Sequence, residues 1–212
     1  MTIKNKESFS TDVCFLIASS AHKSYQKLAI KYAAIEPPTW ALLLAQSCRS
    51  VGYKVSILDA NAENLSDDQI LIRINELNPR IICLVVYGQN VNAGTANMRG
   101  AIDINNFLKI NKISCPTAFI GSHVQALPVD TLKKEKSIDI VFTNEGVYAL
   151  RNLLKLDNFS LENLKDIKGI AYRKDDEIKI NLPEKVVPTE RMDIDLPGYA
   201  WDLLPYKNKP LD

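Results

Sequence analysis

Six consecutive apolar residues near the start of the chain decide its fold: Val13-Cys14-Phe15-Leu16-Ile17-Ala18. Such a continuous run is typical of a strand buried on both faces, because a strand with one solvated face alternates apolar and polar residues. A second run of this kind, Ile81–Val86, lies farther along the chain. Both runs predict strands of a parallel sheet that helices cover on both sides.

Helical and strand patterns alternate around these runs. Pro37-Pro38 precede an apolar stripe at helical spacing from Trp40 to Val51, and Ser66-Asp67-Asp68-Gln69 has the pattern of a capping box. We expect an α/β fold with a five-stranded parallel sheet in the doubly wound, flavodoxin-like or Rossmann-like order 2-1-3-4-5. Its ligand crevice would lie at the carboxyl edge, between strands 1 and 3. The expected strands are residues 13–18, 54–58, 81–86, 117–120 and 138–142.

The pattern changes after about residue 157. Gly169–Arg173 and Glu177–Ile180 flank an acidic turn and predict a β-hairpin. The residues that follow are irregular and rich in proline, so they predict a linker that packs along a neighbour and leads elsewhere. We therefore expect an α/β domain over residues 1–157, and a C-terminal β-hairpin with an irregular linker over residues 158–212.

The composition limits the partners and the location. The formal net charge is +1, which gives no basis for binding nucleic acid or an anionic membrane surface. Residues 1–10 are polar, which argues against secretion, and the longest apolar runs are too short to span a bilayer. The four cysteines are too widely spaced for a zinc or iron–sulfur ligand set. Cys14, Cys48 and Cys83 fall in predicted buried strands or on an apolar helix face, which indicates small core residues in a reducing cytosol. We expect a cytoplasmic protein without nucleic-acid or membrane partners.

Three loops at the expected carboxyl edge carry polar residues. Gly121-Ser122-His123 follows the fourth strand, where glycine would let a ligand approach the backbone. Tyr87-Gly88-Gln89-Asn90 follows the third strand and offers neutral hydrogen-bonding groups to a large ligand. Asn144-Glu145-Gly146 follows the fifth. Each also has a structural interpretation: a plain strand-to-helix connection in the first, a helix cap by Asn92 in the second and a helix-dipole contact by Glu145 in the third.

The connection after the first strand, residues 19–38, is long for this fold and indicates either a functional loop or an inserted helix. Its serines could cradle a phosphate, but it lacks the glycines that would bring backbone amides close. No GxGxxG follows the first strand. Tyr87 stands where a receiver-type phosphoacceptor domain would need an aspartate. Dinucleotide binding and phosphoacceptor chemistry therefore find no support in these motifs.

Taken in order, these motifs resemble the N-terminal cobalamin-binding domain of B12-dependent radical SAM enzymes, over about residues 12–206. The resemblance rests on the order and spacing of the motifs rather than on any one of them. The matching features are Pro37-Pro38, Leu58-Asp59, Tyr87-Gly88-Gln89-Asn90 with Thr95, Gly121-Ser122-His123 with Ala126-Leu127-Pro128, Asn144-Glu145-Gly146, the run Ile167–Arg173, Asp195-Leu196-Pro197 and the run Ala200–Pro205.

The resemblance implies a chain that holds cobalamin base-off over the carboxyl edge, without a protein histidine on cobalt and without catalytic residues. It implies that a larger side chain at Gly121 blocks the corrin while leaving the fold intact. His22 is not assigned to cobalt, because the Asp-x-His-x-x-Gly pattern of mutase-type domains is incomplete around it. The candidate cofactor contacts are Gln89, Asn90, Thr95, Gly121, Ser122, His123, Ala126, Glu145 and Gly146.

The radical SAM motif Cys-x-x-x-Cys-x-x-Cys does not occur in this chain. The resemblance therefore places the 4Fe-4S cluster and S-adenosylmethionine in a separate catalytic domain, in cis or in trans, and implies a methyltransferase-type parent enzyme. The alternative is a stand-alone flavodoxin-like module that binds a nucleotide or a partner without a corrinoid. Three closely spaced cysteines downstream of Asp212 would favour the first interpretation.

Overall fold

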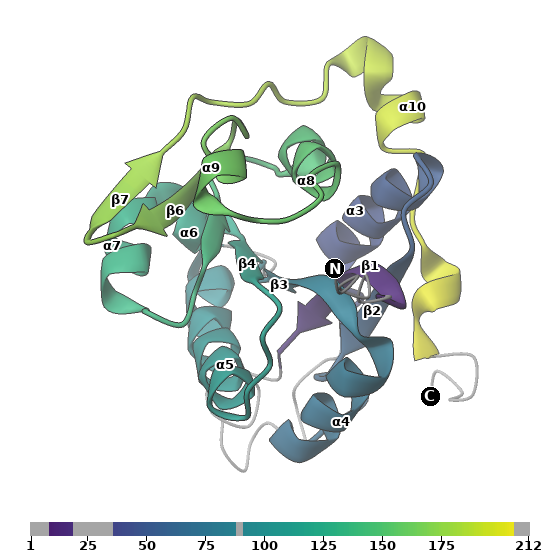
Figure 1. The fold of residues 1–212 in the computed structure, drawn as a ribbon. Coiled ribbons are helices and arrows are strands. Elements are labelled where there is room, and N and C mark those ends of the chain that lie inside the picture. Colours follow the sequence, from purple (N-terminus) through teal and green to yellow (C-terminus); the bar gives the residue numbers. More distant parts are fainter. Residues whose placement is uncertain (1–8, 19–35, 88–90, 206–212) are drawn as a thin grey trace, which may run out of the picture.

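The computed structural model describes residues 9–18, 36–87 and 91–205 of the chain. Its centre is one seven-stranded sheet in the order β2-β1-β3-β4-β5-β6-β7 (Figure 1). The first five strands are parallel, and β6 and β7 are antiparallel to their neighbours. The strands are β1 Thr11–Ile17, β2 Val55–Asp59, β3 Pro79–Val85, β4 Thr117–Ile120, β5 Ile140–Phe142, β6 Ile170–Lys174 and β7 Glu177–Ile180.

This order confirms the predicted doubly wound sheet. Val13 of β1 pairs with Val55 of β2 on one side and with Ile81 of β3 on the other. The predicted hairpin also forms, but β6 pairs with β5, with Val141 opposite Ala171, so the hairpin extends the sheet. The division of the chain near residue 157 stays a prediction about folding units, and the sheet itself continues across it.

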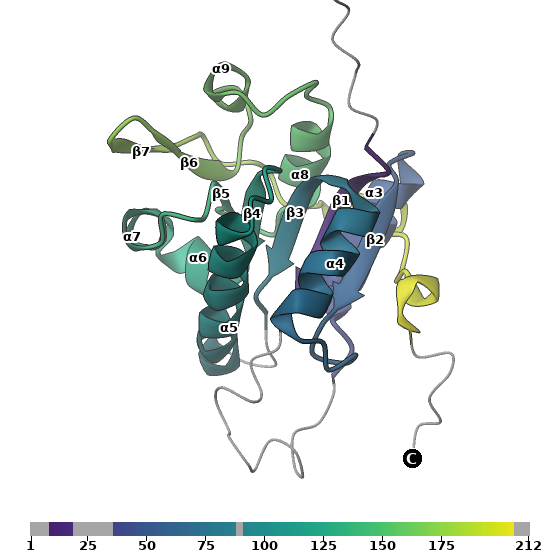
Figure 2. The ribbon, with the colours of Figure 1, turned by 60° about the horizontal axis from the view of Figure 1, so that its bottom comes forward.

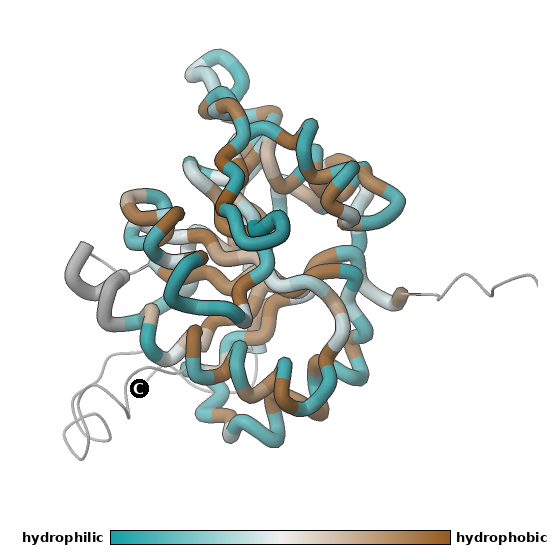
Figure 3. The backbone as a smooth tube through the Cα atoms, turned by 60° about the vertical axis from the view of Figure 1, so that its left-hand side comes forward, coloured by the Kyte–Doolittle hydropathy of each residue, from teal (hydrophilic) through white to brown (hydrophobic). Residues whose placement is uncertain are grey.

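Helices cover both faces of the sheet (Figures 1 and 2): α3 and α8 pack on one face, and α4 to α7 on the other. Figure 3 shows hydrophilic and hydrophobic residues alternating along the helices, as expected where one side packs on a sheet. Within the described ranges, no helix has both the length and the apolar character needed to cross a membrane. The helices are α3 Thr39–Ser50, α4 Asp67–Leu77, α5 Val91–Ile110, α6 Ser122–Ala126, α7 Pro128–Lys134, α8 Val147–Leu154, α9 Leu161–Leu164 and α10 Met192–Asp195, with short 3-10 turns at Thr189–Arg191 and Trp201–Leu203.

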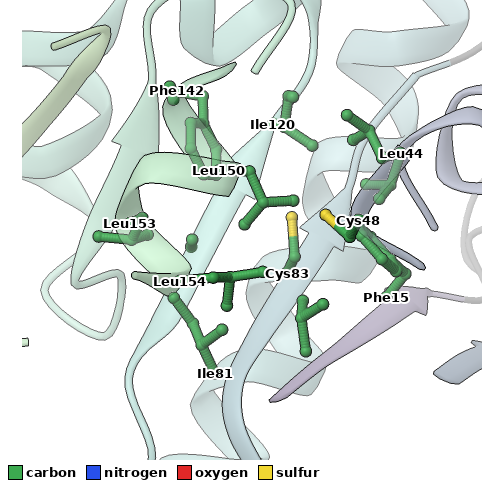
Figure 4. Packing of buried hydrophobic residues seen from close by; sticks show 14 of the residues in the cluster. Phe15, Leu44, Cys48, Ile81, Cys83, Ile120, Phe142, Leu150, Leu153 and Leu154 are labelled. Carbon is green, nitrogen blue, oxygen red and sulfur yellow. The ribbon is translucent and has the colours of Figure 1, made fainter. Parts of the chain in front are cut away.

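The central position of β1 explains its continuous apolar run. Val13 and Phe15 belong to the core beneath α3 and α8, whereas Cys14 and Leu16 belong to the core beneath α4 and α5. All four side chains are fully buried. Figure 4 shows Phe15 in the first of these cores, next to Cys48 of α3. Each face of the strand therefore needs apolar residues, which removes the alternation of a one-sided strand.

Residues 182–205 form a strap that crosses from the hairpin to α3 (Figure 1, yellow-green to yellow). A buried ion pair holds its centre, because Arg151 Nη1 in α8 donates to Asp195 Oδ1 at 2.7 Å. The same guanidinium donates to the Ser47 carbonyl oxygen in α3 at 2.9 Å. Farther along the strap, the Ala200 amide donates to a carbonyl oxygen of α3 at 3.3 Å. Over its described residues, the predicted linker thus packs along its own domain.

The four cysteines are free thiols, and three of them are buried. Burial raises the pKa of Cys14 and Cys48 to about 12 and that of the half-buried Cys115 to about 11, so these thiols are protonated near neutral pH.

We expect the native chain to react slowly with DTNB at mildly alkaline pH, and all four thiols to react once guanidinium unfolds it. The control is Cys115→Ser, and rapid reaction of that variant in its native state would contradict the buried positions.

Candidate functional site

The carboxyl ends of the five parallel strands lie along one edge of the sheet, which is where an open α/β domain binds its ligand (Figure 2). Gln89 and Asn90 lie outside the described residues, as does His22, and nothing is described of the side chain of Thr95 in α5. The other six predicted contacts are described, and all of them follow β4 or β5: Gly121, Ser122, His123, Ala126, Glu145 and Gly146.

A short helix follows β4 directly. α6 begins at Ser122, and the backbone N–H of Gln125 donates to the Gly121 carbonyl oxygen at 3.0 Å. Ser122 and His123 are half-buried in its first turn, whereas Ala126 at its end is exposed. The sequence predicts the next helix, α7 from Pro128, but not α6. The segment is therefore more than the plain connection that one interpretation of the sequence offered.

Gly121 lies against the backbone of the neighbouring strand. A β-carbon at this position would lie 2.2 Å from the carbonyl oxygen of Val86, the residue after β3. The Val86 amide donates to the Ile120 carbonyl oxygen at 2.7 Å, which holds the two segments together. The expectation that a larger side chain at Gly121 leaves the fold intact is therefore wrong, because that side chain would collide with Val86 first.

The turn Asn144-Glu145-Gly146 after β5 anchors the strap. Glu145 Oε1 accepts a hydrogen bond from the Val187 amide at 2.6 Å, and Asn144 Nδ2 donates to the Glu184 carbonyl oxygen at 2.9 Å. Gly146 caps α8 with a φ of 81°, a left-handed conformation that favours glycine. The Glu145 carboxylate thus has a partner within the chain, and its contact with a cofactor stays a prediction.

Three residues outside the nine candidates join α3 to the ends of β3 and β5 and to α6. Gln125 Nε2 donates to Tyr87 Oη at 2.5 Å and to the Asn144 carbonyl oxygen at 2.6 Å. The Tyr87 ring packs on Trp40 of α3, with 5.7 Å between the ring centroids. Trp40 Nε1 in turn donates to the Glu145 carbonyl oxygen at 3.1 Å. Burial raises the pKa of the Tyr87 phenol, so its hydroxyl is protonated near neutral pH.

The groups that these residues bring to the carboxyl edge are mainly aromatic rings, amides and hydroxyls. Such groups hold a ligand by packing and by neutral hydrogen bonds. A corrinoid fits this chemistry, because its broad apolar ring carries amide groups around its rim. Among the side chains of the described residues, no group of three or more histidine, cysteine, aspartate or glutamate residues is placed to hold a metal ion.

The fold and this edge define an open, doubly wound α/β domain whose ligand site lies at the carboxyl ends of its strands. A family model described as the B12 binding domain matches residues 25–154, which is more than half of the chain. The chain belongs to the B12-binding domain family, which confirms the family predicted from its motifs.

Two similar curated proteins are both named anaerobic magnesium-protoporphyrin IX monomethyl ester cyclase. The protein from Synechocystis sp. is 26% identical over 172 residues, which cover 81% of this chain and 32% of the relative. The protein from Rubrivivax gelatinosus is 24% identical over 189 residues, which cover 88% of this chain and 32% of the relative. This chain thus spans about a third of the length of these relatives.

Two solved structures of TsrM, a radical S-adenosylmethionine methyltransferase from Kitasatospora setae, share the fold. The one with cobalamin and a [4Fe-4S] cluster bound has a TM-score of 0.59 at 13% identity, over 81% of this chain and 30% of the TsrM chain. The one with tryptophan and a SAM analogue bound has a TM-score of 0.57 at 15% identity, over 82% and 30% of the two chains. At these identities, the likeness shows the fold alone.

Proposed function

We propose that this chain binds cobalamin at the carboxyl edge of its sheet, as the cobalamin-binding part of a larger radical SAM enzyme. The family match over residues 25–154 carries the proposal, because this range includes β3, β4, β5 and the connections that end on that edge. The rings and neutral polar groups described there suit a corrinoid. When bound, cobalamin supplies cobalt chemistry such as the carriage of a methyl group.

The role proposed for this chain is to bind and orient the cofactor. Gly121 and Gly146 would present only backbone to the cofactor. Packing within the chain also excludes a β-carbon at both positions, since it would lie 2.2 Å from Val86 O and 2.4 Å from Ile120 Cδ1 respectively. Ser122 and His123 are the first polar residues that follow β4 in the sequence, and both are half-buried. The proposed contacts are Gln89, Asn90, Thr95, Gly121, Ser122, His123, Ala126, Glu145 and Gly146.

The parent enzyme would contain a part that this chain lacks. A catalytic domain in cis or in trans would hold the 4Fe-4S cluster and S-adenosylmethionine, and the greater length of the relatives supports such a domain. Methyl transfer is the reaction that the family resemblance implies, and TsrM is a methyltransferase, whereas the curated relatives are cyclases. The role proposed here is therefore restricted to holding cobalamin. The cytoplasmic location and the lack of nucleic-acid and membrane partners stay predictions.

The direct test is retention of hydroxocobalamin by the purified chain. After mixing and desalting, we expect nearly one cobalt per chain, measured by elemental analysis, together with a visible spectrum of the base-off form. The same chain desalted in urea is the control, because retention should require the folded sheet. A folded chain that retains no cobalt and shows no spectral change during titration would contradict the proposal and favour the stand-alone module.

The two histidines of the chain, His22 and His123, allow a sharp test of cobalt coordination. Because we expect no protein histidine on cobalt, the double variant His22→Ala/His123→Ala should give the same band positions for bound cobalamin as the unchanged chain. His123→Ala alone is expected to weaken binding modestly, since His123 is a proposed contact. A shift of the bands in either variant would identify an imidazole as an axial ligand.

A further inference from the structure

Gln125 uses one nitrogen to join the ends of two strands. Its Nε2 donates both hydrogens, one to Tyr87 Oη after β3 and the other to the Asn144 carbonyl oxygen after β5, at 2.5 and 2.6 Å. Between these strands in the sheet lies β4, and α6, which carries Gln125, begins directly after it. The side chain therefore bridges over the end of β4 at the carboxyl edge.

Tyr87 is held from three sides. Gln125 binds its hydroxyl, Trp40 of α3 packs on its ring, and Asn97 Nδ2 of α5 donates to its carbonyl oxygen at 3.1 Å. Because α3 and α5 cover opposite faces of the sheet, the contacts fix Tyr87 between the two layers. Among the described residues, Gln125 is the one that forms a hydrogen bond with the phenol hydroxyl.

The second partner of Gln125 belongs to the turn that carries Glu145. The Glu145 carbonyl oxygen accepts from Trp40, and its carboxylate accepts from the strap. Gln125, Tyr87, Trp40 and this turn thus form a closed ring of contacts around the carboxyl ends of β3, β4 and β5. Losing the Gln125 amide would open the ring at two places and leave a carbonyl oxygen and a phenol without their partners.

We propose that Gln125 is a positioning residue of the cobalamin site, acting through Tyr87 and the Asn144 turn rather than through cobalt chemistry. The inference rests on the proposed function. Gln125 keeps the edge in the shape that receives the corrin, so part of the binding free energy depends on hydrogen bonds within the edge itself. Pre-organisation of this kind lowers the cost of ordering the site when the ligand binds.

A double-mutant cycle for cobalamin affinity tests this proposal. Gln125→Leu removes both donors at similar volume, and Tyr87→Phe removes the hydroxyl but keeps the ring on Trp40. We expect Gln125→Leu to weaken hydroxocobalamin binding about tenfold in the otherwise unchanged chain and clearly less in the Tyr87→Phe background, because the two residues share one hydrogen bond. We also expect the circular dichroism of the bound corrin at saturation to change in Gln125→Leu.

The matched control is Gln46→Leu in α3, since Gln46 Oε1 accepts from Arg49 Nη2 at 2.6 Å, and Arg49 in turn pairs with Asp202 in the strap. That variant should bind cobalamin as the unchanged chain does. An affinity of Gln125→Leu within twofold of the unchanged chain, or fully additive effects of Gln125→Leu and Tyr87→Phe, would overturn the proposal. If Gln125→Leu does not fold, Tyr87→Phe alone decides, and unchanged affinity and dichroism there would overturn it. Failure of the unchanged chain to bind would overturn the proposed function itself.

Discussion

Replacing Asp195 by asparagine should lower the free energy of unfolding by about 3 kcal/mol, because it leaves the buried Arg151 guanidinium without its carboxylate. The two side chains are only 6% and 9% exposed and lie 2.7 Å apart. Tyr148 Oη also donates to Asp195 at 2.7 Å, and Arg191 Nε donates at 2.9 Å. Urea denaturation of Asp195→Asn measures the loss of unfolding free energy, and the strap should detach from α3 and α8 in the same transition.

The same carboxylate makes part of the stability depend on pH. Hydrogen bonds from Arg191, then Tyr148 and Arg151, hold the pKa of Asp195 well below its ordinary range. A lowered pKa means that the stabilisation is fully present above about pH 4 and is lost as the pH falls toward the folded-state pKa. The advantage of the unchanged chain over Asp195→Asn should therefore shrink on acidification below about pH 4.

The control for this prediction lies on the same short helix. Asp193 in α10 is exposed, so Asp193→Asn should change the free energy of unfolding by less than about 0.5 kcal/mol. Equal stabilities of the Asp193 and Asp195 variants would show that the strap is not held by the buried pair.

The second large effect is expected at Gly121, where alanine should destabilise the domain by about 3 kcal/mol or more. The added β-carbon would lie 2.2 Å from the Val86 carbonyl oxygen, so β3 and the end of β4 would have to separate. Thermal unfolding followed by circular dichroism gives the change in stability. Because a loss of stability can itself weaken cobalamin binding, the affinity of this variant does not by itself assign Gly121 to the site.

Gly198 in the strap supplies the comparison for Gly121→Ala. It has a φ of 91°, and nothing lies within 4 Å of a β-carbon built there. Gly198→Ala should therefore cost about 1–2 kcal/mol, for the backbone conformation alone. A Gly121→Ala variant as stable as Gly198→Ala would mean that the two segments can move apart.

The central part of the fold could be predicted from the sequence because its signals are local. The apolar run of β1 indicates burial on both faces, and the capping box of α4 forms as predicted, with Gln69 Oε1 accepting from the Ser66 amide at 2.9 Å. α6 gave no such signal, because five residues are too few to show a helical period. The pairing of β6 with β5 and the path of the strap depend on contacts between distant residues, such as Arg151 with Asp195.

The site could be located from the sequence, but the partners of its residues could not. The carboxyl ends of β4 and β5 are where the motifs place Gly121 and Glu145. What approaches Gly121 in the structure is Val86, and what binds the Glu145 carboxylate is Val187, 42 residues away. The contacts of Gln125 could not be predicted, because the direction of its side chain depends on α6, and the sequence did not predict that helix. Spacing along a chain indicates which loops meet, whereas tertiary packing decides what each side chain touches.

The strap also bears on how the chain folds during its synthesis. α3 is made early, but it acquires the bidentate contact between Arg49 and Asp202 only when a residue 153 positions later is available. Until then, the part of α3 that contacts the strap is uncovered, and Arg151 has no carboxylate partner in the strap. Contacts of such long sequence separation form slowly. A ribosome-bound chain that ends before the strap should therefore stay incompletely packed and accessible to chaperones, and the domain should become resistant to protease only after residues 195–204 have emerged.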